Sequence, residues 1–304
     1  MTSVRFPQRL FIVTGKGGVG KSTVAAALGL RLSRAGEKVL VCEVGGPNRL
    51  SALYGVPVGK DVTEVAPRLF AVNVDPEAAL HEYGLMVLKY ERLYRAVFGN
   101  RVVRYFLKFV PSLQELVLLG KILFHVRETA ADGSFRFDRV IIDAPATGHA
   151  ISFFSLPQVL VDTVPPGPLS ADATWMRDLL VDSATTGVIL VTLPEELPVT
   201  ETLELHASLN NKVKLSSVAV VLNQTRSSRL SDEALRDPAW EAHSELHGLV
   251  KNHERLAHAT GVSTARLKSL GLPVLWLPHV TATGTATALV TAMAEHLPFE
   301  APRP

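Results

Sequence analysis

Residues 10–34 read LFIVTGKGGVGKSTVAAALGLRLSR, and this stretch decides the fold class. A short apolar run leads into a glycine-rich loop, and the loop leads directly into a segment with helical spacing. Gly15, Gly20, Lys21 and Ser22 satisfy the pattern G-x-x-x-x-G-K-[ST] of phosphate-binding loops. Glycines let backbone N–H groups turn towards phosphate oxygens without Cβ clashes, and a helix N-terminus favours the same negative charge. The stretch therefore predicts a strand, an anion-binding loop and a helix in succession.

Further short apolar runs, rich in β-branched residues, recur along the chain at 38–44, 69–75, 139–144, 187–193, 218–223 and 274–278. They lack the period-two alternation of strands that face water, which is typical of strands buried on both faces of a parallel sheet. Longer helix-patterned segments separate most of them. The pattern predicts an α/β fold of the P-loop NTPase kind, with a doubly wound, mostly parallel sheet flanked by helices. Right-handed crossovers place the ligand site at the carboxyl ends of the strands.

The bulk composition limits the classes of function. The chain has 304 residues, a formal net charge of +2 and a single cysteine, Cys42. The small charge argues against nucleic acid as a partner, and one cysteine excludes a disulfide within the chain or a Cys-x-x-Cys zinc site. We find no apolar run of 18 or more residues and no signal-peptide core, so we expect a cytoplasmic protein without a transmembrane span.

The order of the segments predicts one domain over residues 1–304 with two interruptions. The first is a helical insert at 76–131, between the third predicted strand and the fourth. The second is a shorter insert at 162–187, where prolines and a glycine precede a short helical pattern.

The glycine-rich loop assigns roles to individual side chains. Lys21 is expected to reach the β- and γ-phosphates of ATP, the Ser22 hydroxyl to bind Mg²⁺, and Thr23 to lie near the α-phosphate. Asp143 ends the predicted strand at 139–144, where a carboxylate can hold a Mg²⁺-bound water. The predicted phosphate-binding residues are Gly15, Lys16, Gly17, Gly18, Val19, Gly20, Lys21, Ser22 and Thr23.

Several motifs together resemble one protein family. KGGVGKST (16–23) resembles the deviant Walker A loop of the MinD/ParA/ArsA class, and IIDAPATGHAISFF (141–154) resembles the switch II signature D-x-A-P-T-G-H of its ArsA branch. VVLNQT (220–225) and LPHVTATG (277–284) are similar to the adenine-binding segments of that branch. The resemblance implies an ATPase that uses Mg²⁺, and a role for Lys16 in contacting phosphate across a dimer. It also implies adenine contacts from Asn223, Pro278, His279 and Val280.

Two departures from the ArsA pattern affect the expected chemistry. The family's switch I aspartate is absent from CEVGGPNRL (42–50), so Glu43 is expected to position the attacking water or to join the Mg²⁺ shell. The predicted catalytic residues are thus Lys16, Lys21, Glu43 and Asp143, and the predicted metal ligands are Ser22 and Asp143. The resemblance covers arsenite pumps and ATPases that target tail-anchored membrane proteins, and a single cysteine disfavours both a thiolate metalloid site and a zinc clamp.

The helical insert combines aromatic, apolar and basic residues. Residues 89–108 contain six lysines and arginines and a single acidic residue, Glu91. The next stretch, LQELVLLGKILF (113–124), is strongly apolar. Such a segment suits a hydrophobic client helix or an anionic membrane surface, and it is equally typical of a face packed on the core or on a partner subunit. The aromatic residues are Tyr83, Tyr90, Tyr94, Phe98, Tyr105, Phe106, Phe109 and Phe124.

These observations leave three hypotheses. The first is a Mg²⁺-dependent ATPase of the ArsA type, a homodimer or a heterodimer with a paralogue, whose nucleotide state switches the helical insert and its client. The second is a nucleotide-gated scaffold with little turnover, because switch I lacks its aspartate. The third is a MinD/ParA-like positioning ATPase; the C-terminal segment 286–298 has no lysine or arginine, which disfavours membrane targeting of that kind.

Overall fold

The computed structural model describes residues 4–75, 78–79, 111–228, 230–231, 234, 244–281 and 284–300. An eight-stranded sheet forms the centre, with strand order β4-β5-β3-β6-β2-β7-β8-β9, and β1 pairs with β10 in a separate two-stranded sheet. The strands are β1 Val4–Arg5, β2 Leu10–Gly15, β3 Val39–Val44, β4 Thr63–Ala66, β5 Leu69–Val74, β6 Arg139–Asp143, β7 Thr186–Thr192, β8 Ser217–Thr225, β9 Val274–Pro278 and β10 Phe299–Glu300.

All the strands predicted from apolar runs are present in the sheet. β2, β6 and β7 are buried at every position, as expected for strands covered on both faces. The pairs of the large sheet are parallel except β4 with β5, an antiparallel edge pair that the sequence analysis did not predict. β4 was not predicted because none of its residues is fully buried, so its sequence lacks the apolar run that identified the other strands of the sheet.

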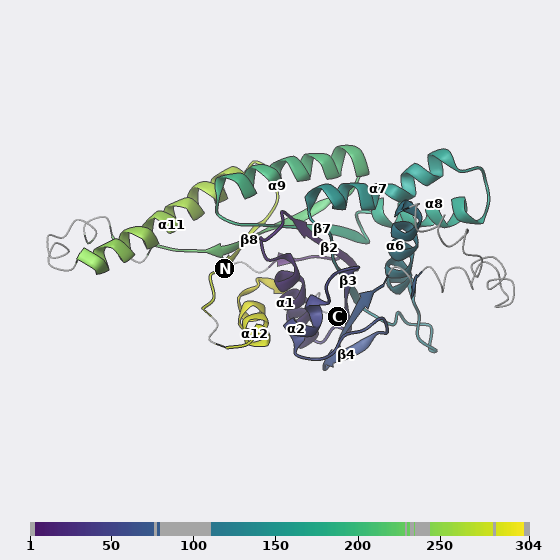
Figure 1. Ribbon diagram of the computed structural model, residues 1–304, viewed down its shortest axis with the longest axis horizontal. Helices are drawn as coiled ribbons and strands as arrows, with labels where there is room; N and C mark the ends of the chain where they lie inside the picture. The colour runs from purple at the N-terminus through teal and green to yellow at the C-terminus, as the bar shows by residue number, and fades with distance from the viewer. Residues whose placement is uncertain are drawn as a thin grey trace.

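Helices cover both faces of the sheet (Figure 1). One face carries α1, α2 and α12, and the other carries α6, α7, α8 and α9, which contribute to separate buried clusters. α11 packs on α9 and β8 and extends beyond the body of the molecule. The helices are α1 Lys21–Arg34, α2 Arg49–Tyr54, α6 Pro111–Arg127, α7 Thr147–Thr163, α8 Pro168–Val181, α9 Glu196–Ser208 with a π-helical turn Leu209–Val213, α11 Ser244–Lys268 and α12 Ala286–His296.

The order of the strands indicates where a ligand would bind on the sheet. From β2 the chain first builds the half with β3, β5 and β4, returns to β6, and then builds the other half from β7 onwards. The strand order thus reverses beside β2, and ligands of doubly wound sheets bind at the carboxyl ends of the strands near such a reversal. Among the residues that the structure describes, no helix combines the length and the apolar character needed to cross a membrane.

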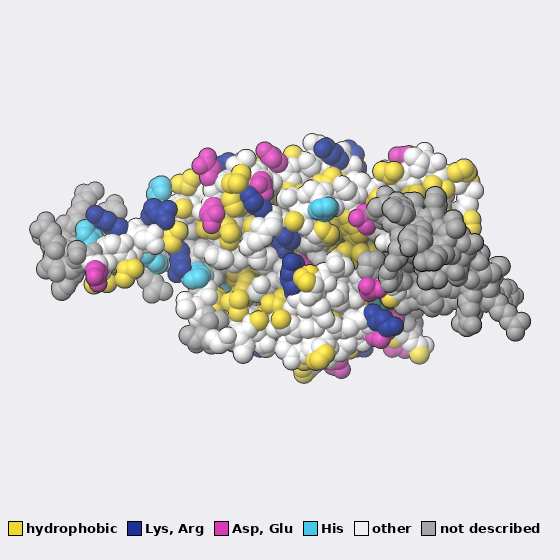
Figure 2. Space-filling view, in the orientation of Figure 1, with side chains coloured by type: hydrophobic (Ala, Val, Ile, Leu, Met, Phe, Trp, Pro, Cys, Tyr) yellow, Lys and Arg dark blue, Asp and Glu magenta, His cyan; other side chains and the backbone are white. Residues whose placement is uncertain are grey.

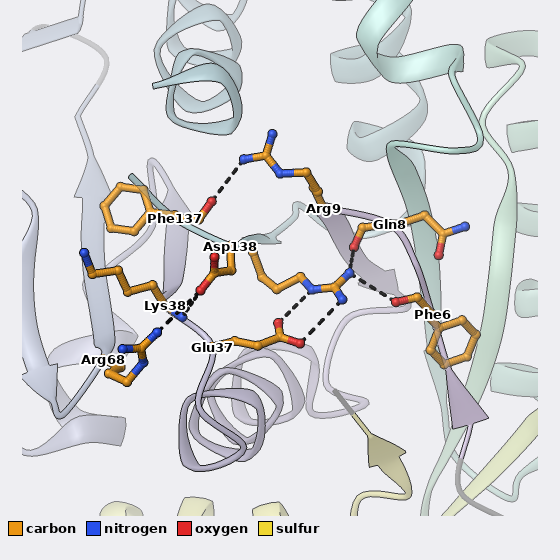
Figure 3. Close-up of polar contacts among 9 residues, drawn as sticks. Phe6, Gln8, Arg9, Glu37, Lys38, Arg68, Phe137 and Asp138 are labelled. Carbon is orange, nitrogen blue, oxygen red and sulfur yellow. Dashed lines mark hydrogen bonds and ion pairs between the residues drawn. The ribbon is translucent and has the colours of Figure 1, made fainter. Parts of the chain in front are cut away.

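The opposite edge of the sheet is held by a buried guanidinium (Figure 3). Arg139, at the start of β6, pairs with Glu37 at 2.7 Å and donates to the carbonyl oxygens of Phe6 and Gln8. The Arg139 side chain is 5% exposed and that of Glu37 is 12% exposed, so little water screens this pair. The contacts connect the segment before β2 to the residues that follow α1 and to the start of β6.

Glu37→Gln is expected to destabilise the protein by about 3 kcal/mol, because it leaves the Arg139 charge buried without its counter-ion. Urea unfolding curves would give the free energy of unfolding. Arg68→Gln is the control, since the Arg68–Asp138 pair spans 3.7 Å with both side chains 51% exposed. It should cost less than about 0.5 kcal/mol. Equal losses for the two variants would contradict the prediction.

Candidate active site

The glycine-rich loop joins β2 to α1 at the carboxyl edge of the sheet. Gly18 and Gly20 have φ values of 86° and 93°, in the left-handed region that favours glycine. A Cβ at Gly15 would lie 2.1 Å from the carbonyl oxygen of Val191, and one at Gly20 would lie 2.6 Å from Nδ2 of Asn223. The loop therefore requires glycine at these positions, and it ends at the N-terminus of α1, where backbone N–H groups can bind an anion.

Three predicted residues lie together beside this loop. The Ser22 hydroxyl and the Lys21 ammonium are both close enough to the carboxyl group of Asp143 to lower its pKa, the first through its polar group and the second through its charge. Lys21 Nζ also donates to the carbonyl oxygen of Lys16 at 2.9 Å, within its own loop. Burial lowers the pKa of Lys21, and Asp143 opposes that shift. A hydroxyl and a carboxylate next to a phosphate-binding loop are the hard oxygen ligands that Mg²⁺ prefers.

Asp143 lies in an environment that disfavours its negative charge. Its side chain is buried, and this burial raises the pKa of Asp143 to about 6, with a further contribution from Glu43. Glu43 on β3 is the neighbour of Asp143 in the sheet register. Two buried carboxylates side by side repel each other, and a bound divalent cation would relieve that repulsion. The site thus fits Mg²⁺ by charge as well as by ligand type.

Glu43 has a second set of contacts that the sequence analysis did not predict. Its side-chain oxygens accept hydrogen bonds from the backbone N–H groups of Arg49 at 3.0 Å and Leu50 at 3.2 Å, in the first turn of α2. A Cβ on Gly46 would lie 2.2 Å from Oε1 of Glu43, so the intervening loop closes over this carboxylate. The geometry favours a structural role in holding the switch I segment, and water positioning by Glu43 stays a prediction.

The side chain of Lys16 forms an ion pair within its own chain. Its Nζ lies 2.7 Å from Oε1 of Glu201, on α9, and the two side chains are 28% and 30% exposed. Glu201 was not among the predicted site residues, because no short motif marks it and the two residues are 185 positions apart.

The residues predicted to bind adenine are also brought to this edge. Asn223 lies near the end of β8, where Nδ2 donates to the carbonyl oxygen of Val19 at 2.9 Å and Oδ1 accepts from the N–H of Gln224. Asn223 thereby holds the phosphate-binding loop, a contact that the sequence analysis did not predict. Pro278 pairs with Thr225 across β8 and β9, and the N–H of His279 donates to the carbonyl oxygen of Thr225. Val280 packs against the core.

Comparison with known proteins agrees with the geometry of the loop. The profile of the Anion-transporting ATPase family, ArsA_ATPase, matches residues 8–165, which include the glycine-rich loop, Glu43 and Asp143. The chain belongs to the ArsA family of ATPases. This finding confirms the resemblance inferred from the motifs, and it makes ATP the nucleotide of the site.

Relatives of this ArsA-family ATPase differ in how much of the chain they match. ATPase BagA of Mycobacterium tuberculosis is 33% identical over 300 residues, covering 90% of this chain and 87% of its own. A putative arsenical pump-driving ATPase of Halobacterium salinarum is 28% identical over 71% of this chain and 35% of its own. ATPase GET3 of Mycosarcoma maydis is 30% identical over 49% of this chain and 42% of its own. The first of these relatives thus matches nearly end to end, and the others match in part.

An apolar cavity of about 550 Å³ lies between α6 and α8 in this ArsA-family ATPase. Phe124 on its wall is 56% exposed, and the Arg127 guanidinium lies 5.3 Å from the ring centre of Trp175. Figure 2 shows hydrophobic side chains in yellow over this end of the molecule, beside residues drawn in grey. The described lining residues are Ala79, Leu116, Val117, Gly120, Lys121, Phe124, His125, Arg127, Asp172, Trp175 and Met176.

The structure brings Lys21, Ser22 and Asp143 of the predicted site together, and their roles stay predictions. The aromatic and basic residues predicted at 83–109 lie outside the described residues, so the character of that part of the insert stays a prediction. Within the described ranges, no group of three or more histidine, cysteine or acidic side chains is placed to hold a metal by itself. A Mg²⁺ ion at Ser22 and Asp143 would complete its shell with phosphate oxygens and water, as is usual for this ion.

Proposed function

We propose that this ATPase works as a Mg²⁺-dependent dimer that opens and closes an apolar client site. The observation that carries the proposal is the direct connection between Asp143 and the cavity. β6 ends at Asp143 and leads within a few residues into α7, which packs against α6 and α8. Phe153 and Phe154 of α7 share one buried cluster with Leu116 of α6 and Met176 of α8. A shift at the end of β6 would therefore be transmitted to the cavity wall.

The predicted residues other than Glu43 divide into three groups in this cycle: those that bind phosphate and Mg²⁺, the lysine that acts on the other copy, and those that contact adenine. The loop N–H groups and Lys21 bind the phosphates, and Ser22 and Asp143 hold the Mg²⁺, which neutralises phosphate charge when bound. Lys16 of one copy acts on the γ-phosphate bound by the other copy, so hydrolysis requires two chains. Asn223, Pro278, His279 and Val280 contact the adenine. The partner is a second copy or a paralogue, and the 76–131 insert within the single domain carries the client, in the cytoplasm.

The nucleotide-gated scaffold remains the second candidate, because one specific observation favours it. The Glu43 carboxylate already accepts two backbone hydrogen bonds from α2, which leaves it poorly arranged to orient water. Misalignment of a reacting group costs on the order of 10²-fold in rate. In this alternative, ATP binding changes the shape of the protein and hydrolysis is incidental.

ATP hydrolysis per chain is expected to rise with protein concentration and to disappear when EDTA removes Mg²⁺. The rise follows because each site needs a residue from a second chain. Sedimentation in the presence of a non-hydrolysable ATP analogue would show the dimer at the same concentrations. Activity per chain that is independent of concentration would contradict the homodimer.

The client part of the proposal has its own readout in the same experiment. A fluorescently labelled apolar helical peptide should bind in the presence of the ATP analogue and dissociate with ADP, and Met176→Arg should weaken its binding. Asp178→Asn, on the same helix with its side chain 59% exposed, is the matched control. Peptide binding that is unaffected by the nucleotide and by Met176→Arg would contradict a client site at this cavity.

A further inference from the structure

The Lys16–Glu201 ion pair joins the phosphate-binding loop to α9 of the same chain. Lys16 Nζ and Glu201 Oε1 are 2.7 Å apart, which is a charge-assisted hydrogen bond. Both side chains are about 30% exposed, so water reaches the pair from one side. The backbone carbonyl oxygen of Lys16 accepts a hydrogen bond from Lys21 Nζ, within the loop itself. The ammonium of Lys16 is therefore held by a carboxylate outside the loop.

Glu201 stands on a rigid support. Thr202 and Leu205 on the same helix are buried, and the helix packs against β7 and β2. Arg266 of α11 also donates to Thr200 Oγ1 at 2.9 Å, one residue before Glu201. Glu201 is fixed to α9 by these contacts. The Lys16 ammonium must therefore break its ion pair with Glu201 before it can reach a phosphate bound by a second chain.

The pair opposes an action of Lys16 on a second chain in two ways. The ammonium carries one positive charge, and Glu201 neutralises it at contact distance. A phosphate that approached Lys16 in this position would also meet the Glu201 carboxylate, and like charges at such distances repel strongly where water is partly excluded. Both effects are present before dimerisation and must be overcome during it.

We propose that Glu201 is a latch that holds Lys16 in cis and so sets the protein concentration at which two ATP-loaded chains associate. The inference rests on the proposed action of Lys16 across a dimer. Release of the latch is coupled to the approach of the partner's phosphates, which replace the carboxylate as the counter-ion. The latch therefore raises the concentration of ATP-bound chains at which hydrolysis begins.

Glu201→Gln is expected to lower the concentration of half-maximal activity by about tenfold and to leave the maximal rate unchanged. A partly exposed ion pair contributes up to about a fivefold factor, and a symmetric dimer breaks two such pairs, so the factors multiply. Salt should lower the half-maximal concentration of the native protein more than that of Glu201→Gln, because salt screens the pair. Sedimentation with a non-hydrolysable ATP analogue should show the same shift in dimer formation, independently of turnover.

Glu204→Gln is the matched control, since it removes the same charge from an exposed position of α9. It should leave the half-maximal concentration unchanged, and Glu201→Asp should fall between the native protein and Glu201→Gln. A reduced maximal rate in Glu201→Gln, or an unchanged midpoint, would overturn the latch. If Lys16→Ala leaves native activity intact, the proposed trans action itself fails; if Lys16→Ala abolishes activity while Glu201→Gln shifts nothing, the latch alone fails.

Discussion

Replacing Asp143 with asparagine is expected to lower kcat for ATP hydrolysis on the order of 10²–10³-fold, because it removes the carboxylate that we propose holds Mg²⁺. The same substitution should raise the thermal stability of the protein when Mg²⁺ and nucleotide are absent. Burial and the neighbouring Glu43 raise the pKa of Asp143 to about 6, so the ionised carboxylate destabilises the empty site at neutral pH. Asparagine keeps the shape and an acceptor for Ser22 without that charge.

The sign of the pH dependence follows from linkage. A carboxyl group with a raised pKa binds its proton more tightly in the folded protein than in the unfolded chain, between its ordinary pKa and about 6. The free energy of unfolding contributed by Asp143 therefore falls as the pH rises through that window, by up to about 3 kcal/mol. Asp143→Asn should remove this fall.

The measurement is thermal unfolding of both proteins from pH 4 to pH 8 in EDTA, followed by the same scans with ATP and Mg²⁺. The native protein should gain stability on adding Mg²⁺ to the ATP complex, and the variant should gain much less. Asp178→Asn, at an exposed position of α8, provides a matched control for the loss of one negative charge. If the variant were less stable than the native protein at every pH in EDTA, the charge at Asp143 would not be the destabilising group.

The sequence was sufficient to predict the buried parallel strands of the large sheet. Apolar runs without alternation identified every strand of the parallel part of the sheet, because burial on both faces leaves a compositional trace in each strand. The edge strand β4 and the β1–β10 pair left no such trace, since β4 is not fully buried and the other two have two residues each. These elements depend on neighbours that only the folded chain supplies.

The residues of the candidate site also fall into two groups: those that local sequence motifs identify and those whose contacts depend on the folded chain. The loop residues and Asp143 follow local patterns whose backbone geometry is set within a few positions, and they were predicted together. The capping of α2 by Glu43, the bond from Asn223 to Val19 and the Lys16–Glu201 pair each depend on where a side chain points after folding. For Glu43 the difference matters to function, because a residue type that suits water positioning is here bonded to a helix N-terminus.

Lys16→Ala is expected to lower kcat on the order of 10³-fold, the size of effect that a cation supplied in trans has in related phosphoryl-transfer sites. ATP should still bind, because the loop N–H groups, Lys21 and the N-terminus of α1 remain. The comparison is kcat against the Kd for ATP, measured separately at a protein concentration where the native chain is dimeric. Lys38→Ala removes the same charge at the opposite edge of the sheet, where its backbone N–H contacts Asp138, and should leave both values unchanged.

Mixing Lys16→Ala with Asp143→Asn tests directly whether the lysine acts across the dimer. In a mixed dimer, the Lys16→Ala chain retains its own Asp143 and receives Lys16 from the other chain, so one site is complete. Random pairing of equal amounts of the two variants should restore about a quarter of the native activity, because half of the dimers are mixed and each has one complete site. A mixture as inactive as its components would show that Lys16 acts within its own chain, where it lies beside Glu201 in this structure.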